Sequence, residues 1–439
     1  MQFKYGLDDK PPFFENLLLG LQWIFIAIPS ILIIGKIVGG LHFVNPLDQI
    51  IYLQKMSFVM GVTLFFQVFL GHRLPLIVGP STVLLIGVIA SRGFSAEAIY
   101  SSIMIGGLLL ALFSGTGLFG SFRRLFTPRV VAVVLLLIGL TLMPTVINLI
   151  TQSVGSSSSW PNIVFACGLS LGMFYLQKKL KGIWKSTLIV WAMFLGTVGY
   201  YLIFPDGFAA AMISNLGAFS FFFKHLTTGF FNHLQTGLSI EPGVLISFLI
   251  CFLALSINDL ASIESMEEML KPSNMPLRIN RGITFTGIAN VLAGFFGVVG
   301  PVNFSLSPGV ILSTGCASRY TLVPTSLALF LLSFSPAALG AIGIVPSVVI
   351  GSVLVYILFF QVMAGLMILL QADGRLKFET GLVVGLPLLL GTVVAFLPAG
   401  MIDSLPVPLR PVLGNGFVVG IFSAFFLEGL VFRQKRKLN

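Results

Sequence analysis

Long apolar runs dominate this 439-residue sequence and limit what it can fold into. Hydrophobic residues make up 56% of the chain and charged residues only 9%, whereas about 25% of the residues in a soluble domain are charged. So few charged side chains cannot cover the surface of a water-soluble globule of this size. The composition excludes a soluble enzyme, a disordered chain and a nucleic-acid-binding domain. It predicts an all-α polytopic membrane protein that is surrounded by the lipid bilayer.

Fourteen hydrophobic segments can be identified, since a helix needs about 20 apolar residues to cross a bilayer. They are residues 16–39, 50–70, 74–90, 98–119, 129–150, 160–177, 184–204, 243–265, 282–299, 301–316, 321–345, 347–371, 379–398 and 411–432. Segments three and ten are atypical, because both are short and carry Pro and Gly in their middle.

The positions of Lys and Arg support this count. If the N-terminus is cytoplasmic and every segment crosses, 20 of the 25 basic residues fall on the cytoplasmic side. Cytoplasmic loops of membrane proteins are enriched in Lys and Arg. The sequence therefore predicts a multi-pass protein of the plasma (inner) membrane with both termini in the cytoplasm. The same loops explain the net charge of +10 without any nucleic acid.

The fourteen segments divide into two halves of seven, and an odd number of spans per half makes the second half inverted. Segments three and ten hold the same position in the two halves, and both are interrupted. Backbone that is not helical at membrane depth is tolerated only inside protein or beside a polar cavity. A half-helix that begins there directs its N-terminal N–H groups at that cavity. Paired broken segments in inverted halves indicate the binding site of a transporter.

Several motifs resemble the nucleobase–ascorbate transporter family, also called nucleobase:cation symporter-2, which includes uracil, xanthine and purine permeases. The stretch QVFLGHRLPLIVGPS, from Gln67 to Ser81, is similar to the family's Q-x-x-x-G-x-R-L-P-x-x-x-G-x-S. The stretch GVILSTGCASR, from Gly309 to Arg319, is close to the family's G-L-V-A-L-T-G-V-A-S-R. The resemblance implies a divergent member with two inverted seven-span repeats, in which segments three and ten each carry a short strand and a half-helix.

The resemblance also implies two domains and a function. Residues 1–122 (spans 1–4) and 243–345 (spans 8–11) would form a core domain, and residues 123–242 (spans 5–7) and 346–439 (spans 12–14) a gate domain. The implied activity is import of a nucleobase, a purine or related planar heterocycle, by alternating access. H⁺ or Na⁺ would be the coupling ion, with no organic cofactor, no metal site and no enzymatic reaction. A homodimer would fit the family.

Three positions depart from the family pattern. Trp23 replaces a first-span His, Leu255 stands where the eighth span usually has Glu, and Leu306 stands where the tenth span has Gln or Glu. The side chains that hold the nucleobase edge in typical members are therefore replaced by Leu. This leaves open an anion carrier of the same architecture, like the sulfate and bicarbonate carriers. A sensor that no longer moves substrate is a third alternative.

The candidate substrate contacts lie in the first and eighth spans and at the two breaks. They are Trp23, Ser81, Thr82, Leu255, Ser305, Leu306 and Ser307. The ring of Trp23 could stack on a planar heterocycle or pack against neighbouring helices. The hydroxyl groups could contact a ligand or cap the half-helices, and one residue could do both.

Asp259 is the most informative single residue, because it follows the apolar run 243–257 inside a predicted span. A charged Asp near the bilayer centre costs about 2.5–3.5 kcal/mol on insertion scales. It is therefore a candidate cation-coupling site or a structural hydrogen-bond anchor. Gln22, Asn258 and Asn303 are supporting polar residues at membrane depth, suited to substrate contacts and to helix–helix hydrogen bonds alike.

Overall fold

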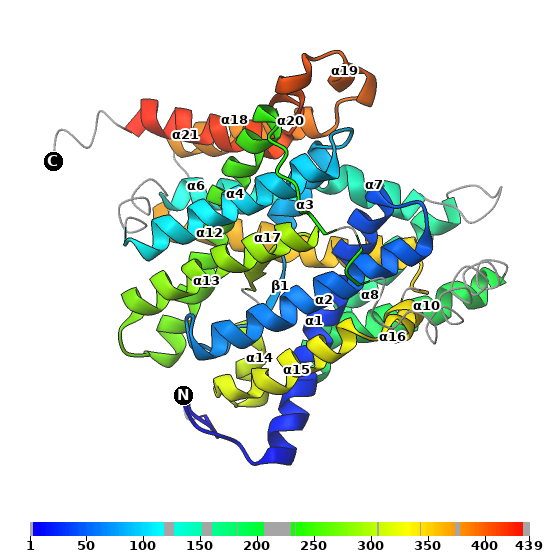
Figure 1. Ribbon diagram of the computed structural model, residues 1–439, viewed down its shortest axis with the longest axis vertical. Helices are drawn as coiled ribbons and strands as arrows, with labels where there is room; N and C mark the ends of the chain where they lie inside the picture. The colour runs from blue at the N-terminus through cyan, green and yellow to red at the C-terminus, as the bar shows by residue number, and fades with distance from the viewer. Residues whose placement is uncertain are drawn as a thin grey trace.

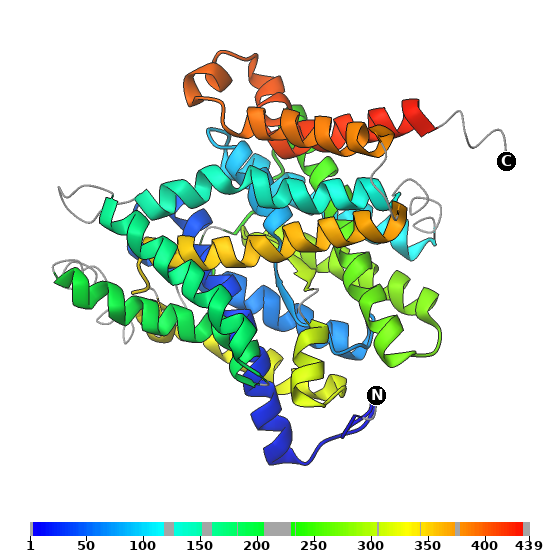
Figure 2. The ribbon, with the colours of Figure 1, turned by 180° about the vertical axis from the view of Figure 1, so that it is seen from behind.

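The computed structural model describes residues 3–117, 127–151, 160–181, 183–205, 230–232, 234–304, 307–342, 344–373 and 378–432. This part of the chain is a stack of packed helices, many of which run across the page in Figures 1 and 2, around one two-stranded sheet. The predicted all-α polytopic architecture is confirmed.

Each predicted segment corresponds to a helix, a broken helix, or a strand followed by a helix. The first half contains α1 (Phe13–His42), α2 (Pro46–Phe69), β1 (Val78–Pro80) with α3 (Thr82–Ala90), α4 (Ala96–Gly115), α6 (Pro128–Thr141) with α7 (Met143–Thr151), α8 (Trp160–Lys179), and α9 (Ile183–Ser186) with α10 (Leu188–Ile203). The second half contains α12 (Pro242–Leu270), α13 (Met275–Phe296), β2 (Pro301–Asn303) with α14 (Ser307–Thr314), η2 (Arg319–Thr321) with α15 (Leu322–Ser333) and α16 (Pro336–Ile342), α17 (Ser347–Asp373), α18 (Phe378–Ala395), α19 (Ala399–Asp403), η3 (Val407–Leu409), and α20 (Arg410–Leu413) with α21 (Gly416–Phe432).

Only some of these helices could cross a bilayer by themselves. Within the described residues, six are long and apolar enough, or seven if the bent pair Val407–Leu413 and Gly416–Gly429 counts as one span. Of the other segments, some are short, such as α10 with 16 residues, and some are interrupted. The helices α8 and α13 have 20 and 22 residues but are less apolar. Segments three and ten are interrupted in the way that their Pro and Gly residues predict.

Segments three and ten meet as two short antiparallel strands. In this pairing Val78 of β1 lies opposite Asn303 of β2, and Pro80 lies opposite Pro301. A half-helix follows each strand. The hydroxyl of Ser81 caps α3 by accepting the N–H of Leu84 at 3.3 Å, so a strand and a half-helix are present in segment three as expected. Segment ten has the same order, with α14 after β2.

The contacts between helices have the symmetry expected of two inverted repeats. The second segment packs on the eleventh (α2 on α15), and the ninth packs on the fourth (α13 on α4). Adding or subtracting seven turns one pair into the other, as inverted repeats require. The α4–α13 contact is close because glycines form it: a Cβ on Gly287 would lie 2.5 Å from the backbone N of Ala111. Small residues allow membrane helices to approach in this way.

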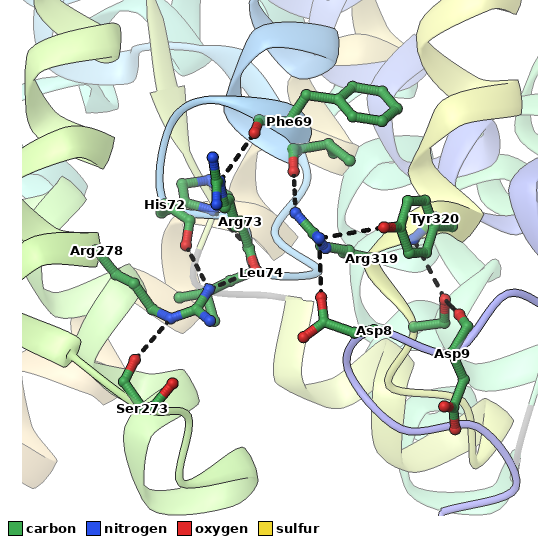
Figure 3. Close-up of polar contacts among 12 residues, drawn as sticks. Asp8, Asp9, Phe69, His72, Arg73, Leu74, Ser273, Arg278, Arg319 and Tyr320 are labelled. Atoms are coloured by element: carbon green, nitrogen blue, oxygen red, sulfur yellow. Dashed lines mark hydrogen bonds and ion pairs between the residues drawn. The ribbon is translucent and has the colours of Figure 1, made fainter.

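The N-terminal segment is tied to the residues that follow α14. Residues 4–7 run parallel to residues 315–319 and share three backbone hydrogen bonds of 2.8, 2.9 and 3.2 Å with them. Arg319 forms an ion pair with Asp8 at 2.8 Å and also donates to the carbonyl of Val68 at 2.8 Å (Figure 3). The last carbonyls of a helix have no partner within the helix. Arg319, which lies after α14, supplies such a partner for the carbonyl of Val68 in the last turn of α2.

A second arginine supports the turn between α2 and β1. Arg278 of α13 donates to the carbonyls of His72 and Arg73 at 3.0 and 2.9 Å (Figure 3). Arg73 has a φ of 56°, a left-handed conformation that is uncommon for a residue with a side chain. The two arginines hold the turn from which segment three enters the fold.

Candidate functional site

A cavity of about 630 Å³ is bordered by both broken segments and by α1, α8, α12 and α17. Segment three contributes Pro80 and Thr82 to its wall, and segment ten contributes Val302, Phe304 and Val310. Sites for small molecules commonly have volumes of about 300–1,000 Å³. The half-helices of the two repeats therefore border one cavity of suitable size for a small ligand.

The polar lining of the cavity comes from both halves of the chain. It comprises Ser30, Thr82, Gln177, Lys181, Lys185, Asn258, Tyr356 and Gln361. The hydroxyl of Tyr356 on α17 donates to Oε1 of Gln177 on α8 at 2.8 Å. Most of the remaining wall is aliphatic or aromatic. An apolar wall with a few polar groups is typical of a small-molecule site, in which the polar groups fix the orientation of the ligand.

Asp259 directly follows the lining residue Asn258 in the sequence. Unlike Asn258, it is fully buried and does not line the cavity. Its Oδ1 accepts the backbone N–H and the side-chain Nδ2–H of Asn303 at 3.0 and 2.7 Å. Its Oδ2 accepts the hydroxyl of Thr286 at 2.7 Å, and that hydroxyl in turn accepts Nε2–H of Gln67 at 3.0 Å. One carboxylate on α12 thus joins β2, α13 and, through Thr286, α2.

His72 extends this buried network and is neutral within it. Its Nδ1 accepts the N–H of Leu74 at 2.9 Å, so Nδ1 carries no proton. Nε2 is then the donor to Oδ1 of Asn303 at 3.1 Å, because a neutral imidazole has one donor and one acceptor nitrogen. Three donors of this network reach Asp259 directly, and His72 reaches it through Asn303.

Comparison with known proteins identifies the family. Residues 14–400 match the xanthine/uracil permease profile of the permease family. The chain is a member of the permease family. The xanthine permease of Bacillus subtilis (strain 168) is 25% identical over 97% of this chain and 96% of its own length. Uric acid permease PucK of the same strain is 23% identical over 97% of each chain. Family membership makes the protein a multi-pass membrane transporter and not an enzyme.

Solved structures with the same fold are transmembrane domains of other transporters. The transmembrane domain of the cyanobacterial bicarbonate transporter BicA matches this permease with a TM-score of 0.59 at 16% identity, covering 87% of this chain and 95% of the other. The murine anion transporter Slc26a9, in its inward-facing state, matches with a TM-score of 0.56 at 13% identity, covering 94% and 69%. At these identities the likeness shows the inverted-repeat fold alone.

The structure of the permease brings some of the sequence-predicted residues together at the cavity. Thr82 and Asn258 line it directly. Ser81 caps α3, and the hydroxyl of Ser307 accepts the N–H of Ile77 at 3.0 Å, which ties α14 to segment three. Asn303 belongs to the network around Asp259. Ser305 and Leu306 lie outside the residues that the structure describes.

Three other candidates in the permease do not line this cavity. Trp23 is buried, and its indole N–H donates to the hydroxyl of Thr321 at 3.0 Å. That contact favours the packing role for Trp23 over stacking on a ligand. Leu255 is fully buried. Oε1 of Gln22 is buried and has no hydrogen-bond partner within the described part of the chain.

Sequence reasoning missed most of the polar lining of the permease. The residues it missed are Ser30, Gln177, Lys181, Lys185, Tyr356 and Gln361. The lysines were visible only as part of a basic loop that orients the chain. The others lie in apolar spans without a motif, so only the packing of distant spans reveals that they share a cavity.

Proposed function

We propose that this permease imports a nucleobase, a purine or related planar heterocycle, through the cavity between its broken segments. The named relatives from Bacillus subtilis are permeases for xanthine and uric acid. The observation that carries the proposal is the position of the cavity, since α3 begins at its wall with Thr82, α14 lines it with Val310 and Leu312, and most of the wall is apolar. A flat heterocycle matches such a site in size and in its mixture of apolar faces and polar edges.

The composition of the cavity wall supports a mechanism of alternating access. Ser30, Thr82 and Asn258 belong to the proposed core domain (1–122 and 243–345), and Gln177 and Tyr356 to the proposed gate domain (123–242 and 346–439). Rocking of one domain against the other would open the cavity to one side of the membrane at a time. We also propose that the permease is a homodimer, which its mass in lipid nanodiscs would test.

The proposed coupling ion is H⁺ or Na⁺, with Asp259 as the residue that senses it. A protonated carboxyl group gains a donor and loses acceptor capacity, so at least one donor on Asn303 or Thr286 would have to turn away. Asn303 is the last residue of β2, and the next residue, Phe304, lines the cavity. Neutralising Asp259 would in this way move a wall of the substrate site.

Uptake in cells that lack their own nucleobase permeases tests the proposal. We expect accumulation of labelled xanthine, uric acid or hypoxanthine above the external concentration. Collapse of the proton gradient should abolish accumulation if H⁺ is coupled, and removal of Na⁺ should do so if Na⁺ is coupled. A surface-expressed permease that takes up none of these bases, nor uracil, would contradict the proposal.

One observation favours a second candidate, a carrier of small inorganic anions. Lys181 and Lys185 both line the cavity, and within the described lining no acidic residue opposes them. Uptake of sulfate or bicarbonate that purines do not inhibit would support this alternative. Binding of a purine without any uptake would instead support the non-transporting sensor.

A further inference from the structure

The charged side chains in and near the cavity lining indicate which charge its ligand carries. Two lysines line it, whereas Asp259, which follows the lining residue Asn258 in sequence, is fully buried within its own hydrogen-bond network. The family's eighth-span Glu is absent, because Leu255 stands there and is fully buried. The described lining therefore carries positive charge that no carboxylate in it balances.

Asn258 is the residue of α12 that lines the cavity within the described part of the chain. It is largely buried, with 8% of its surface exposed. Its backbone carbonyl accepts the hydroxyl of Ser262 at 2.8 Å, but its amide forms no hydrogen bond within the described part of the chain. Because Asn258 lines the cavity, this unpaired amide has donors and an acceptor to offer to a ligand.

Both lysines of the lining belong to the part of the chain that is proposed as the gate domain. Lys181 and Lys185 follow the end of α8, are exposed, and have no ion pair among the described residues. Thr82 is the first residue of α3, and the N-terminus of a helix carries a partial positive charge. The half-helix and the lysines therefore add potentials of the same sign within one cavity.

We propose that the transported species is the anion of a planar nitrogen heterocycle, with Asn258 contacting the ring edge and Lys181 and Lys185 attracting its negative charge. This inference rests on the proposed function and names the charge state of its substrate. It assigns substrate recognition to Asn258, three residues after the position where the family places Glu. It also assigns selection of the charged form to the lysine pair.

The test compares the binding of two purines of similar shape but different charge. Uric acid is an anion at pH 7, whereas xanthine is largely neutral at that pH. Dissociation constants are measured by calorimetry on the purified full-length permease in nanodiscs. The wild type should bind urate more tightly than xanthine. The double variant Lys181→Gln/Lys185→Gln should weaken urate binding about five- to tenfold, and should change xanthine binding less than twofold.

The matched control is Lys178→Gln/Lys179→Gln, which removes the same charge from the neighbouring last turn of α8, outside the cavity lining. It should leave both dissociation constants within twofold of the wild type. Asn258→Leu should weaken both purines, because both lose the edge contact. Asn258→Asp keeps the shape but adds a negative charge, so it should weaken urate more than xanthine. Thermal melting identifies any variant that fails to fold.

The outcomes separate this inference from the proposed function. If xanthine binds at least as tightly as urate and the Lys181/Lys185 variant affects both equally, the charge inference is wrong and the nucleobase function stands. If folded wild type binds neither purine, the proposed function fails as well. If sulfate competes as strongly as urate and Asn258→Leu has no effect on either, the site serves inorganic anions and the inference is overturned.

Discussion

Asp259 anchors three hydrogen bonds and is also the residue proposed to sense the coupling ion. It accepts three hydrogen bonds from neutral donors, and no basic side chain is among its partners in the described part of the chain. A buried carboxylate without a cationic partner is the kind of group whose charge a bound cation or proton can alter most. The hydrogen bonds that hold β2 to α12 are the same bonds that a change of charge would disturb.

Replacing Asp259 with Asn separates the two roles. Asp259→Asn keeps an oxygen for the two donors of Asn303, and its new NH₂ can donate to the hydroxyl of Thr286, which has a free lone pair. We expect normal surface expression, loss of uphill uptake, and persistence of downhill exchange. Surface labelling and concentrative uptake, measured in the same cells, check this.

The control is Asp259→Leu, which leaves three buried donors without an acceptor at about 1–3 kcal/mol each. That variant should express poorly or melt early. A well-expressed Asp259→Asn permease that still concentrates its substrate would remove Asp259 from the coupling mechanism and leave it as an anchor.

At the scale of elements, close helix crossings and side-chain caps hold the broken segments in position. The α4–α13 crossing depends on glycines, because neighbouring backbone fills the space where a Cβ would lie. The turn before β1 depends on Arg278, which satisfies the carbonyls of His72 and Arg73, and on Arg319, which satisfies the carbonyl of Val68 in the last turn of α2. The helix crossing and the arginine contacts therefore both help to hold segments three and ten, which border the cavity, in position.

The close contact of Gly287 with α4 predicts that one added methyl group destabilises the permease. In Gly287→Ala the Cβ would meet the backbone N of Ala111 at 2.5 Å and the carbonyl O of Gly107 at 2.7 Å. Since backbone atoms cannot swing aside, we expect a loss of about 1–3 kcal/mol from overpacking. Gly172→Ala on α8, where no atom lies within 4 Å of the new Cβ, is the matched control. Melting in nanodiscs should fall for the first variant and hold or rise for the second.

The N-terminal contacts predict unequal effects from the two members of one ion pair. Asp8 is 63% exposed at its side chain, and an exposed ion pair contributes at most about 1 kcal/mol, so Asp8→Asn should change the melting temperature little. Arg319→Gln also removes the donor to the carbonyl of Val68, which should cost about 1–3 kcal/mol. Equal destabilisation by both variants would show that the ion pair, and not the carbonyl contact, is what stabilises this region.

For the molecule as a whole, the sequence predicted the features that are local in the chain. Apolar runs located the segments, and Pro and Gly located the breaks at β1–α3 and β2–α14, because each depends on neighbouring residues only. The acid in the eighth span was also visible from sequence. Its partners were not, since Asn303 lies 44 residues away. Gln177 and Tyr356 lie 179 residues apart, and no local pattern announces that they share a cavity.

The orientation of the molecule in the membrane remains a prediction that two engineered cysteines can test. The loop between α1 and α2 has no Lys or Arg between Lys36 and Lys55, whereas the turn between α12 and α13 is flanked by Lys271 and Arg278. Since basic loops stay in the cytoplasm, Val44→Cys should face outward and Asn274→Cys inward. Both positions are exposed in the structure.

The experiment uses whole cells, a permease whose three native cysteines are replaced, and a maleimide that cannot cross the membrane. We expect labelling at position 44 in intact cells, and at position 274 only after the cells are opened. The reverse pattern would invert the topology. Labelling of both sites in intact cells would mean that an odd number of segments between them fails to cross. If every segment between the two sites also crosses, the expected result would put the basic loop that contains Lys181 and Lys185 on the cytoplasmic side, where the proposed import would release the substrate.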